Sequence, residues 1–160
     1  MNNEPSPVKA YIACSWFTPE QRTQLDEGLK ALEKNPTVAR QFSYFPLDHQ
    51  YNGLDVNKHP EISQDIEWQN RTFISDIEGM MGADIGIMLY NPSQIDDGVA
   101  YELGYLRALG KQTVLVIPDD NKTPLNLMLA IGVTGIIHMS ELATFDFRFV
   151  TSRTFKGEVY

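Results

Sequence analysis

The sequence is poor in cysteine, in positive charge and in long apolar runs. Its one cysteine, Cys14, cannot form an intrachain disulfide. Thirteen Lys and Arg against 21 Asp and Glu give a net charge of −8, which disfavours nucleic acid and anionic membranes as partners. The apolar runs are too short to span a bilayer, and residues 1–7 do not resemble a signal peptide. We therefore expect a cytoplasmic protein in a reducing compartment.

Several common functional motifs are also missing. Neither GxGxxG nor GxxxxGK occurs, so dinucleotide or triphosphate binding of the usual type is disfavoured. No Cys/His cluster has zinc spacing, and we expect neither a metal nor a cofactor. Cys14 and Ser15 follow a predicted strand without the pattern of a nucleophile elbow, so acyl transfer has weak support.

The apolar segments that are present alternate between short β-rich runs and longer stretches with helical period. The predicted strands are residues 8–14, 41–45, 85–90, 113–117 and 135–138. The strands at 85–90 and 113–117 are apolar on both faces, as in a parallel sheet covered on both sides. We predict one domain over residues 1–160, an α/β fold with a doubly wound, five-stranded parallel sheet and helices on both faces (flavodoxin-like).

Helix boundaries are marked by capping residues. Thr18, Pro19 and Gln21 form a start signal with a capping box, and this helix ends at Asn35. A second helix is expected from about Pro60 to Gly82, with an apolar stripe at Ile62, Ile66, Phe73, Ile77 and Met80. A third covers residues 97–109, and short helices are expected after Pro124 and Met139.

Ligands of doubly wound folds bind beyond the carboxyl ends of the strands. The loops after Cys14, Tyr90 and Ile117 are therefore candidate site walls. Glu102 follows one of them, in the early part of a predicted helix, beside apolar neighbours. Burial and the helix dipole together predict an ionised, weakly hydrated carboxylate that suits nucleophilic attack on a sugar carbon. The alternative is that Glu102 only complements the dipole.

Other candidate residues also allow two interpretations. Asp97 is the expected N-cap, which leaves Asp96 either functional or part of an Asx turn. Asp76 is either functional or part of a solvated helix face. Tyr11 lies on a strand, where an aromatic side chain is commonly core, and Phe17 after that strand could pack under a helix or stack on a flat ligand.

Taken together, these residues resemble the nucleoside 2-deoxyribosyltransferases, particularly the branch that accepts purines and pyrimidines. The resemblance extends from Tyr11 to Tyr160 and depends on the order and spacing of several motifs. They are Tyr11 with WFT at 16–18, NPTV at 35–38, PLDHQY at 46–51, HPE at 59–61, Asp76, DIGIMLY at 84–90, DDGVAYELGY at 96–105, PLNLM at 124–128 and the terminal Val159-Tyr160.

The resemblance implies transfer of a 2-deoxyribosyl group from a 2′-deoxynucleoside to a free nucleobase, with no cofactor. Glu102 matches the nucleophile, and Tyr11 matches the tyrosine beside it. Asp76 and Asp96 match the carboxylates that hold the base and serve its proton transfers.

The resemblance also implies substrate contacts and assembly. Phe17 and Gln50 match residues of the base and sugar pocket. Asn126 and Met128 match residues from a neighbouring subunit, with Asn126 reaching the sugar 5′-hydroxyl, and Tyr160 matches the terminal tyrosine whose carboxylate closes the site. The expected assembly is a homo-oligomer, a hexamer built from dimers.

The chain departs from its relatives at Ala13-Cys14-Ser15, where they are often glycine-rich. Added atoms there bear on tolerance at the sugar 2′ position. Two alternative functions stay open. One is an N-glycoside hydrolase of deoxynucleosides or their 5′-monophosphates, and the other is a nucleotide-sensing or protein-binding module.

Overall fold

A parallel sheet of four strands forms the centre of the protein, in the order β1-β2-β3-β4. The strands are β1 (Ala10–Cys14), β2 (Ile85–Leu89), β3 (Gln112–Ile117) and β4 (Gly135–His138). This computed structural model describes residues 5–160, so the expectation for residues 1–7 lies mostly outside the described part. Every residue of β1 and β2 is buried, as their uninterrupted apolar sequences predicted.

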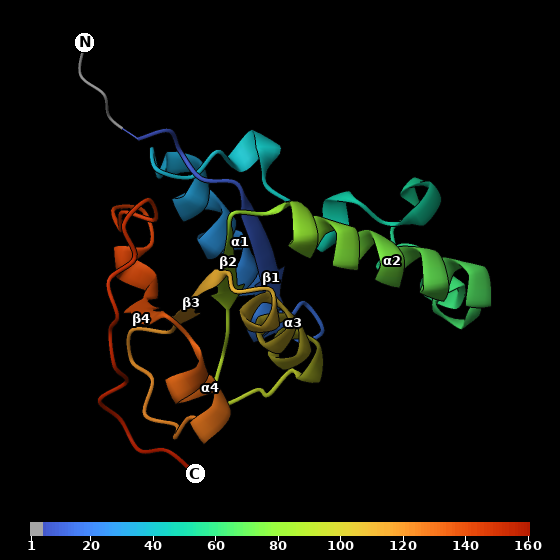
Figure 1. The fold of residues 1–160 in the computed structure, drawn as a ribbon. Helices are drawn as coiled ribbons and strands as arrows, with labels where there is room; N and C mark the ends of the chain where they lie inside the picture. The colour runs from blue at the N-terminus through green and yellow to red at the C-terminus, as the bar shows by residue number, and fades with distance from the viewer. Residues whose placement is uncertain (1–4) are drawn as a thin grey trace.

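Helices cover both faces of the sheet, which confirms the predicted doubly wound arrangement (Figure 1). Helix α1 (Pro19–Lys34) packs on one face, while α2 (Ile66–Gly82), α3 (Asp97–Ala108) and α4 (Leu127–Gly132) lie toward the other. The capping box predicted at the start of α1 is present. Within residues 5–160, no helix is long and apolar enough to cross a membrane.

The prediction of a fifth strand at residues 41–45 was wrong. The segment begins as a 3-10 turn, and only Tyr44 forms a parallel bridge to Tyr11 of β1. Before the bridge, the Ala10 amide donates to the Ser43 side-chain oxygen at 2.9 Å instead of to a backbone carbonyl. After it, the next ladder donor would be residue 46, and Pro46 has no amide hydrogen. Strand pairing is therefore limited to one bridge.

The second helix also differs from its prediction. Residues Pro60–Gln64 form a 3-10 turn, and α2 starts at Ile66, with the Asp65 side chain accepting from the Trp68 amide at 2.8 Å. The first half of α2 extends away from the sheet (Figure 1). Its expected apolar stripe is consequently only half used: Met80 is buried, whereas Ile66 and Phe73 are 72% and 54% exposed.

The short elements expected near the C-terminus are present. A helix follows Pro124 as α4, and the segment after Met139 is a 3-10 turn, Met139–Glu141. Beyond residue 150 the chain has no helix or named strand. Arg153 forms an isolated parallel bridge to Gly135 of β4, and Val159 forms one to Leu125.

The close contact between α2 and Tyr44 gives a test of the packing. A Cβ added at Gly79 would lie 2.4 Å from the Tyr44 ring, while one added at Gly82 in the same helix would meet nothing within 4 Å. We expect Gly79→Ala to destabilise the protein by about 1–3 kcal/mol despite the better helix propensity of alanine. Gly82→Ala should be neutral or slightly stabilising. Denaturant unfolding of both variants measures the difference, and equal effects would contradict this packing.

Candidate active site

The candidate site begins with a contact between strand β1 and helix α3. Tyr11 is fully buried in β1, and its hydroxyl donates a hydrogen bond to Glu102 Oε1 at 2.7 Å. The Tyr11 ring belongs to the same buried cluster as Val99 and Leu106 of α3, so the helix is held against the strand. The two residues are 91 positions apart in the sequence and meet only through the fold.

The pKa of Glu102 is raised to about 8, mainly by burial and to a smaller extent by the negative charges of Asp76 and Asp96, while the Tyr11 hydrogen bond lowers it. The expectation that the helix dipole would keep this carboxylate ionised was wrong. Glu102 lies in the middle of α3, and the dipole effect is confined to the first turn. In the isolated chain the group is therefore mostly protonated at neutral pH.

Asp76 is joined to this pair through Tyr44. The Tyr44 ring stacks on Tyr11, with centroids 5.5 Å apart, and its hydroxyl donates to Asp76 Oδ1 at 3.0 Å. Burial raises the pKa of Asp76 to about 6, while the Tyr44 hydrogen bond lowers it. Asp76 is thus partly desolvated, and the interpretation as a solvated helix face does not hold.

Asp96 is the N-cap of α3, and the prediction that Asp97 has this role was wrong by one residue. The Asp96 side chain accepts from the Val99 amide at 2.8 Å. Its charge still acts on both Glu102 and Cys14, so it belongs to the same cluster. Among residues 5–160, no three Asp, Glu, His or Cys side chains are grouped as metal ligands.

Two of the predicted substrate-binding residues, Phe17 and Gln50, come from two different loops. Phe17 follows β1 and is 67% exposed, beside the partly buried Trp16. Gln50 is tied to its own loop, since its Oε1 accepts from the Val56 amide at 2.9 Å. Its neighbour His49 stacks on Tyr44 with centroids 4.3 Å apart, and this contact holds the loop beside the cluster.

The other predicted residues, Asn126, Met128 and Tyr160, lie elsewhere. They line a cavity of about 630 Å³ together with residues of α3 that do not include Glu102. Asn126 caps α4, and the Leu127 amide donates to the Tyr160 backbone oxygen at 2.9 Å. Within one chain, therefore, these three residues share a cavity that Glu102 does not line, although Tyr90 in this cavity is close enough to both Asp96 and Tyr160 for their charges to raise its pKa.

The sequence interpretation missed Tyr44 and Ser75. Tyr44 was assigned only to a strand, and the side chain proves to bridge Tyr11, Ser75 and Asp76. A signal was available: Tyr44 lies two residues before Pro46, where the PLDHQY motif starts, and an aromatic near the carboxyl end of a predicted strand faces the site edge.

Comparison with known proteins identifies the family. A family model described as nucleoside 2-deoxyribosyltransferase matches residues 10–139. The chain belongs to this family. The predicted resemblance and the enzyme class are thereby confirmed.

Relatives named nucleoside deoxyribosyltransferase match this sequence over almost its whole length. A nucleoside deoxyribosyltransferase of Lactobacillus leichmannii is 40% identical over 152 residues, covering 94% of this chain and 96% of the relative. Another, of Lactobacillus johnsonii, is 39% identical and covers 91% and 98%. The fold resembles a solved 2-deoxyribosyltransferase of Bacillus psychrosaccharolyticus with a TM-score of 0.75 at 22% identity, covering 92% of this chain and 98% of that one.

Tyr44→Phe tests the link between Tyr44 and Asp76 in this deoxyribosyltransferase family member. The change removes a hydrogen bond that lowers the pKa of Asp76, so we expect that pKa to rise from about 6 by about one unit. Carboxyl-carbon NMR titration measures it. The matched control is Tyr51→Phe, which removes a hydroxyl bonded to the exposed Glu67. An unchanged Asp76 titration in Tyr44→Phe would refute the link.

Proposed function

We propose that this enzyme transfers the 2-deoxyribosyl group of a 2′-deoxynucleoside to another purine or pyrimidine base, within nucleoside salvage. The transfer proceeds with retention through a covalent glycosyl-enzyme on Glu102. The observation that carries this proposal is the 2.7 Å hydrogen bond from Tyr11 to a partly desolvated Glu102, with a second carboxyl group nearby. Membership of the deoxyribosyltransferase family supports it.

In the first step, the bond from C1′ to the base nitrogen breaks, and its electron pair leaves with the base. Positive charge develops on the sugar ring, and an adjacent carboxylate stabilises it electrostatically. A Glu102 oxygen then bonds C1′ on the opposite side from the leaving base. The incoming base attacks C1′, gives up a proton to the carboxylate that protonated the first base, and displaces Glu102 as a carboxylate, so the two inversions give net retention.

The leaving base needs a proton, and Asp76 is the nearest raised-pKa carboxyl group that can supply one. The productive form has Glu102 ionised and Asp76 protonated. With pKa values of about 8 and about 6, this form is a minority at neutral pH in the isolated chain. The reaction proceeds through this form, because the positive charge that develops at C1′ as the glycosidic bond breaks stabilises the Glu102 anion. Asp96 completes the carboxylate group that holds the base.

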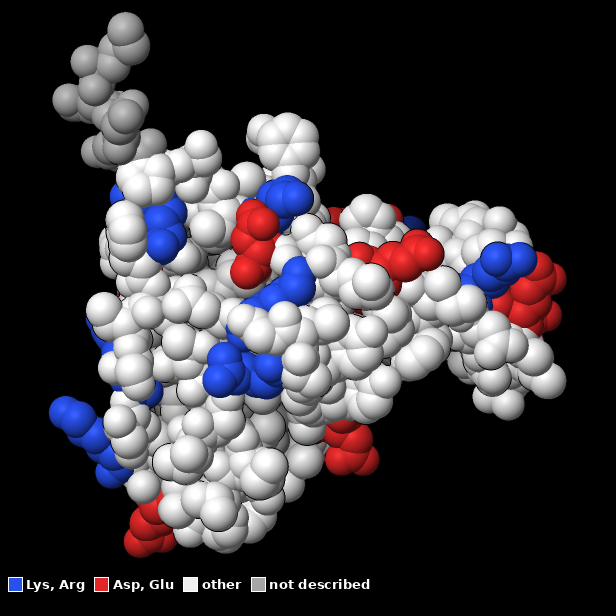
Figure 2. Space-filling model, in the orientation of Figure 1, with Lys and Arg blue, Asp and Glu red and all other residues white. Residues whose placement is uncertain are grey.

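Phe17 and Gln50 are proposed to line the base and sugar pocket, and Asn126, Met128 and Tyr160 to come from a neighbouring subunit. Exposed apolar side chains support assembly: Met128 is 75% exposed and Ile131 on the same helix 63%. Figure 2 shows few charged side chains over α4. A surface of this kind is typical of an interface between subunits. We propose dimers that assemble into a hexamer.

The nucleophile is tested by replacing Glu102 with Ala. We expect exchange between thymidine and free adenine to fall by about a thousandfold or more, because the covalent route is removed. Glu33→Gln, which removes an exposed carboxylate on α1, should exchange at the normal rate. Mass spectrometry of wild-type enzyme quenched during turnover should find one deoxyribosyl group on the peptide that contains Glu102.

Normal exchange by the Glu102→Ala enzyme would exclude this nucleophile. Free deoxyribose that accumulates while acceptor base is in excess would instead assign a hydrolase.

The shared site is tested by mixing two inactive variants. Glu102→Ala and Asn126→Ala should each have low exchange activity alone. If Asn126 serves a neighbouring subunit, oligomers refolded from both chains contain some sites with both native residues, and activity returns. Refolding each variant alone gives the baseline. A mixture that stays at the baseline would place Asn126 in the same chain's site or outside any site.

A further inference from the structure

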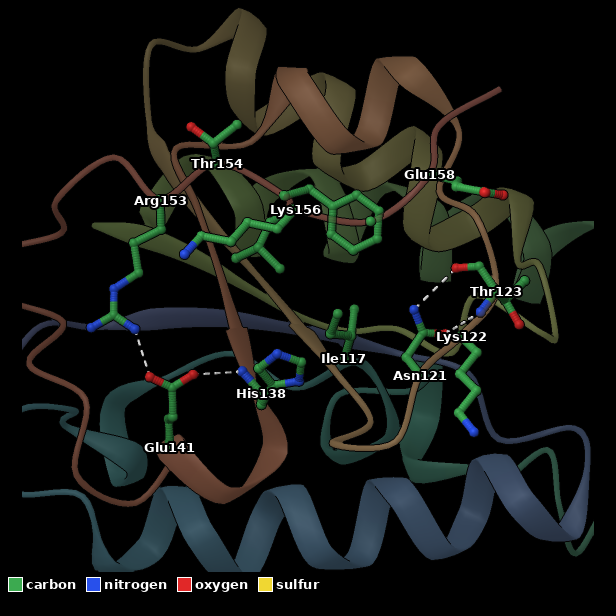
Figure 3. A pocket seen from close by; sticks show the side chains of 13 residues that line it. Ile117, Asn121, Lys122, Thr123, His138, Glu141, Arg153, Thr154, Lys156 and Glu158 are labelled. Atoms are coloured by element: carbon green, nitrogen blue, oxygen red, sulfur yellow. Dashed lines mark hydrogen bonds and ion pairs between the residues drawn. The ribbon is translucent and has the colours of Figure 1, made fainter.

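A second cavity lies at the carboxyl ends of β3 and β4. It has a volume of about 510 Å³, and it is walled by Ile117 of β3, by His138 of β4 and by the C-terminal segment 153–158 (Figure 3). We call this segment the strap. None of the residues Tyr11, Tyr44, Asp76, Asp96 and Glu102 lines the cavity. The proposed transfer reaction therefore leaves it without a function.

The cavity gathers positive charge in an acidic chain. Three of the 13 basic residues line it: Lys122, Arg153 and Lys156. Arg153 forms an ion pair with Glu141 at 2.6 Å, and Glu141 also accepts from the His138 amide at 2.9 Å, so the Glu141 charge is compensated. Within residues 5–160, neither Lys122 nor Lys156 forms an ion pair.

The remaining acidic group is Glu158. Figure 3 shows it across the cavity from Arg153, while the Lys156 side chain extends toward Arg153. The donors on the Arg153 side of the cavity are therefore the Lys156 ammonium, the Arg153 guanidinium, which Glu141 already binds, and the His138 ring, while Figure 3 shows the Thr154 hydroxyl pointing away from them. A doubly charged oxyanion with several acceptor oxygens suits such a group of donors.

The walls beyond the charged side are suited to the rest of a ligand. Ile117, Ile136 and the partly buried Phe155 supply apolar surface, and Thr123 supplies a hydroxyl. A cavity of this size falls in the range that takes a small organic molecule rather than a bare ion. Apolar walls next to a cationic end fit a planar ring joined to a phosphate.

We propose that this cavity binds a nucleoside 5′-monophosphate, with the phosphate between Lys156, Arg153 and His138, and that the ligand ties the strap to the ends of β3 and β4. Lys122 adds attraction from the other wall. The strap continues into Val159, which bridges to Leu125, and into Tyr160, whose amide donates to the Leu125 oxygen at 3.1 Å. Occupancy of the cavity therefore also restrains the C-terminus.

The test uses calorimetric titration of the purified enzyme with deoxyadenosine 5′-monophosphate at low and moderate salt. We expect the double variant Lys122→Gln/Lys156→Gln to bind it about tenfold more weakly or worse, since the charge-assisted contact of Lys156 and the nearby positive charge of Lys122 are lost. The matched control is Lys30→Gln/Lys34→Gln, which removes the same charge from exposed positions on α1 and should bind as wild type does. Added salt should weaken binding to wild type.

Two further measurements separate this site from the carboxylate cluster. The monophosphate should still bind when deoxyadenosine is saturating, and it should shift the amide NMR signals of residues 153–160 in the wild-type enzyme. Complete displacement of the monophosphate by deoxyadenosine would overturn the proposal. So would equally weakened binding of the monophosphate in both double lysine variants, or amide NMR signals of residues 153–160 that do not shift. None of these readouts measures turnover. A failure of the wild-type enzyme to exchange bases would therefore count against the proposed transfer reaction and not against this binding site.

Discussion

The hydrogen bond between the Tyr11 hydroxyl and Glu102 is the contact on which the rest of the site depends. It exists because Tyr11 is fully buried in β1, and because α3 packs its apolar side onto the same face of the sheet. Tyr11 also stacks on the Tyr44 ring. The Tyr44 hydroxyl donates a hydrogen bond to Asp76, and the Tyr44 ring stacks on His49, which holds the loop that contains it. One buried phenol thus sets the positions of two carboxyl groups and one loop.

The protonation state of Glu102 depends on which of several opposing effects on its pKa is larger. At Glu102, burial and two neighbouring carboxylates outweigh one hydrogen bond, and the pKa rises to about 8. The shift from the ordinary value amounts to an ionisation penalty on the order of 5 kcal/mol. That penalty is smaller when a cationic sugar centre faces the carboxylate. The same burial that keeps Glu102 protonated in the free enzyme therefore strengthens the attraction between the Glu102 carboxylate and the cationic sugar centre in the transition state, because little water competes for the charge.

The parts of the fold that sequence predicted are those where one local rule dominates. Unbroken apolar runs gave β2 and β3, and Thr18 with Gln21 gave the start of α1. The false fifth strand shows the limit, because a β-rich run does not reveal that Ser43 and Pro46 end its ladder on both sides. The stripe on α2 was read correctly as apolar, but its period could not say that Phe73 faces outward. Local patterns singled out Glu102 and its neighbours, and family resemblance supplied their roles, whereas the protonation of Glu102 depends on three-dimensional burial that spacing along α3 cannot supply.

The C-terminal residues connect the two cavities of the chain. Tyr160 lines the cavity between α3 and α4, and the strap that precedes it walls the basic cavity at the ends of β3 and β4. Residues 158–160 lie between the two cavities, and backbone hydrogen bonds to Leu125 and Leu127 hold them in place. Such a segment has little buried apolar area of its own, so its order depends on what binds at either end. A ligand under the strap and a neighbouring subunit over Tyr160 would each restrain the same short stretch of chain, and by linkage each would favour the binding of the other.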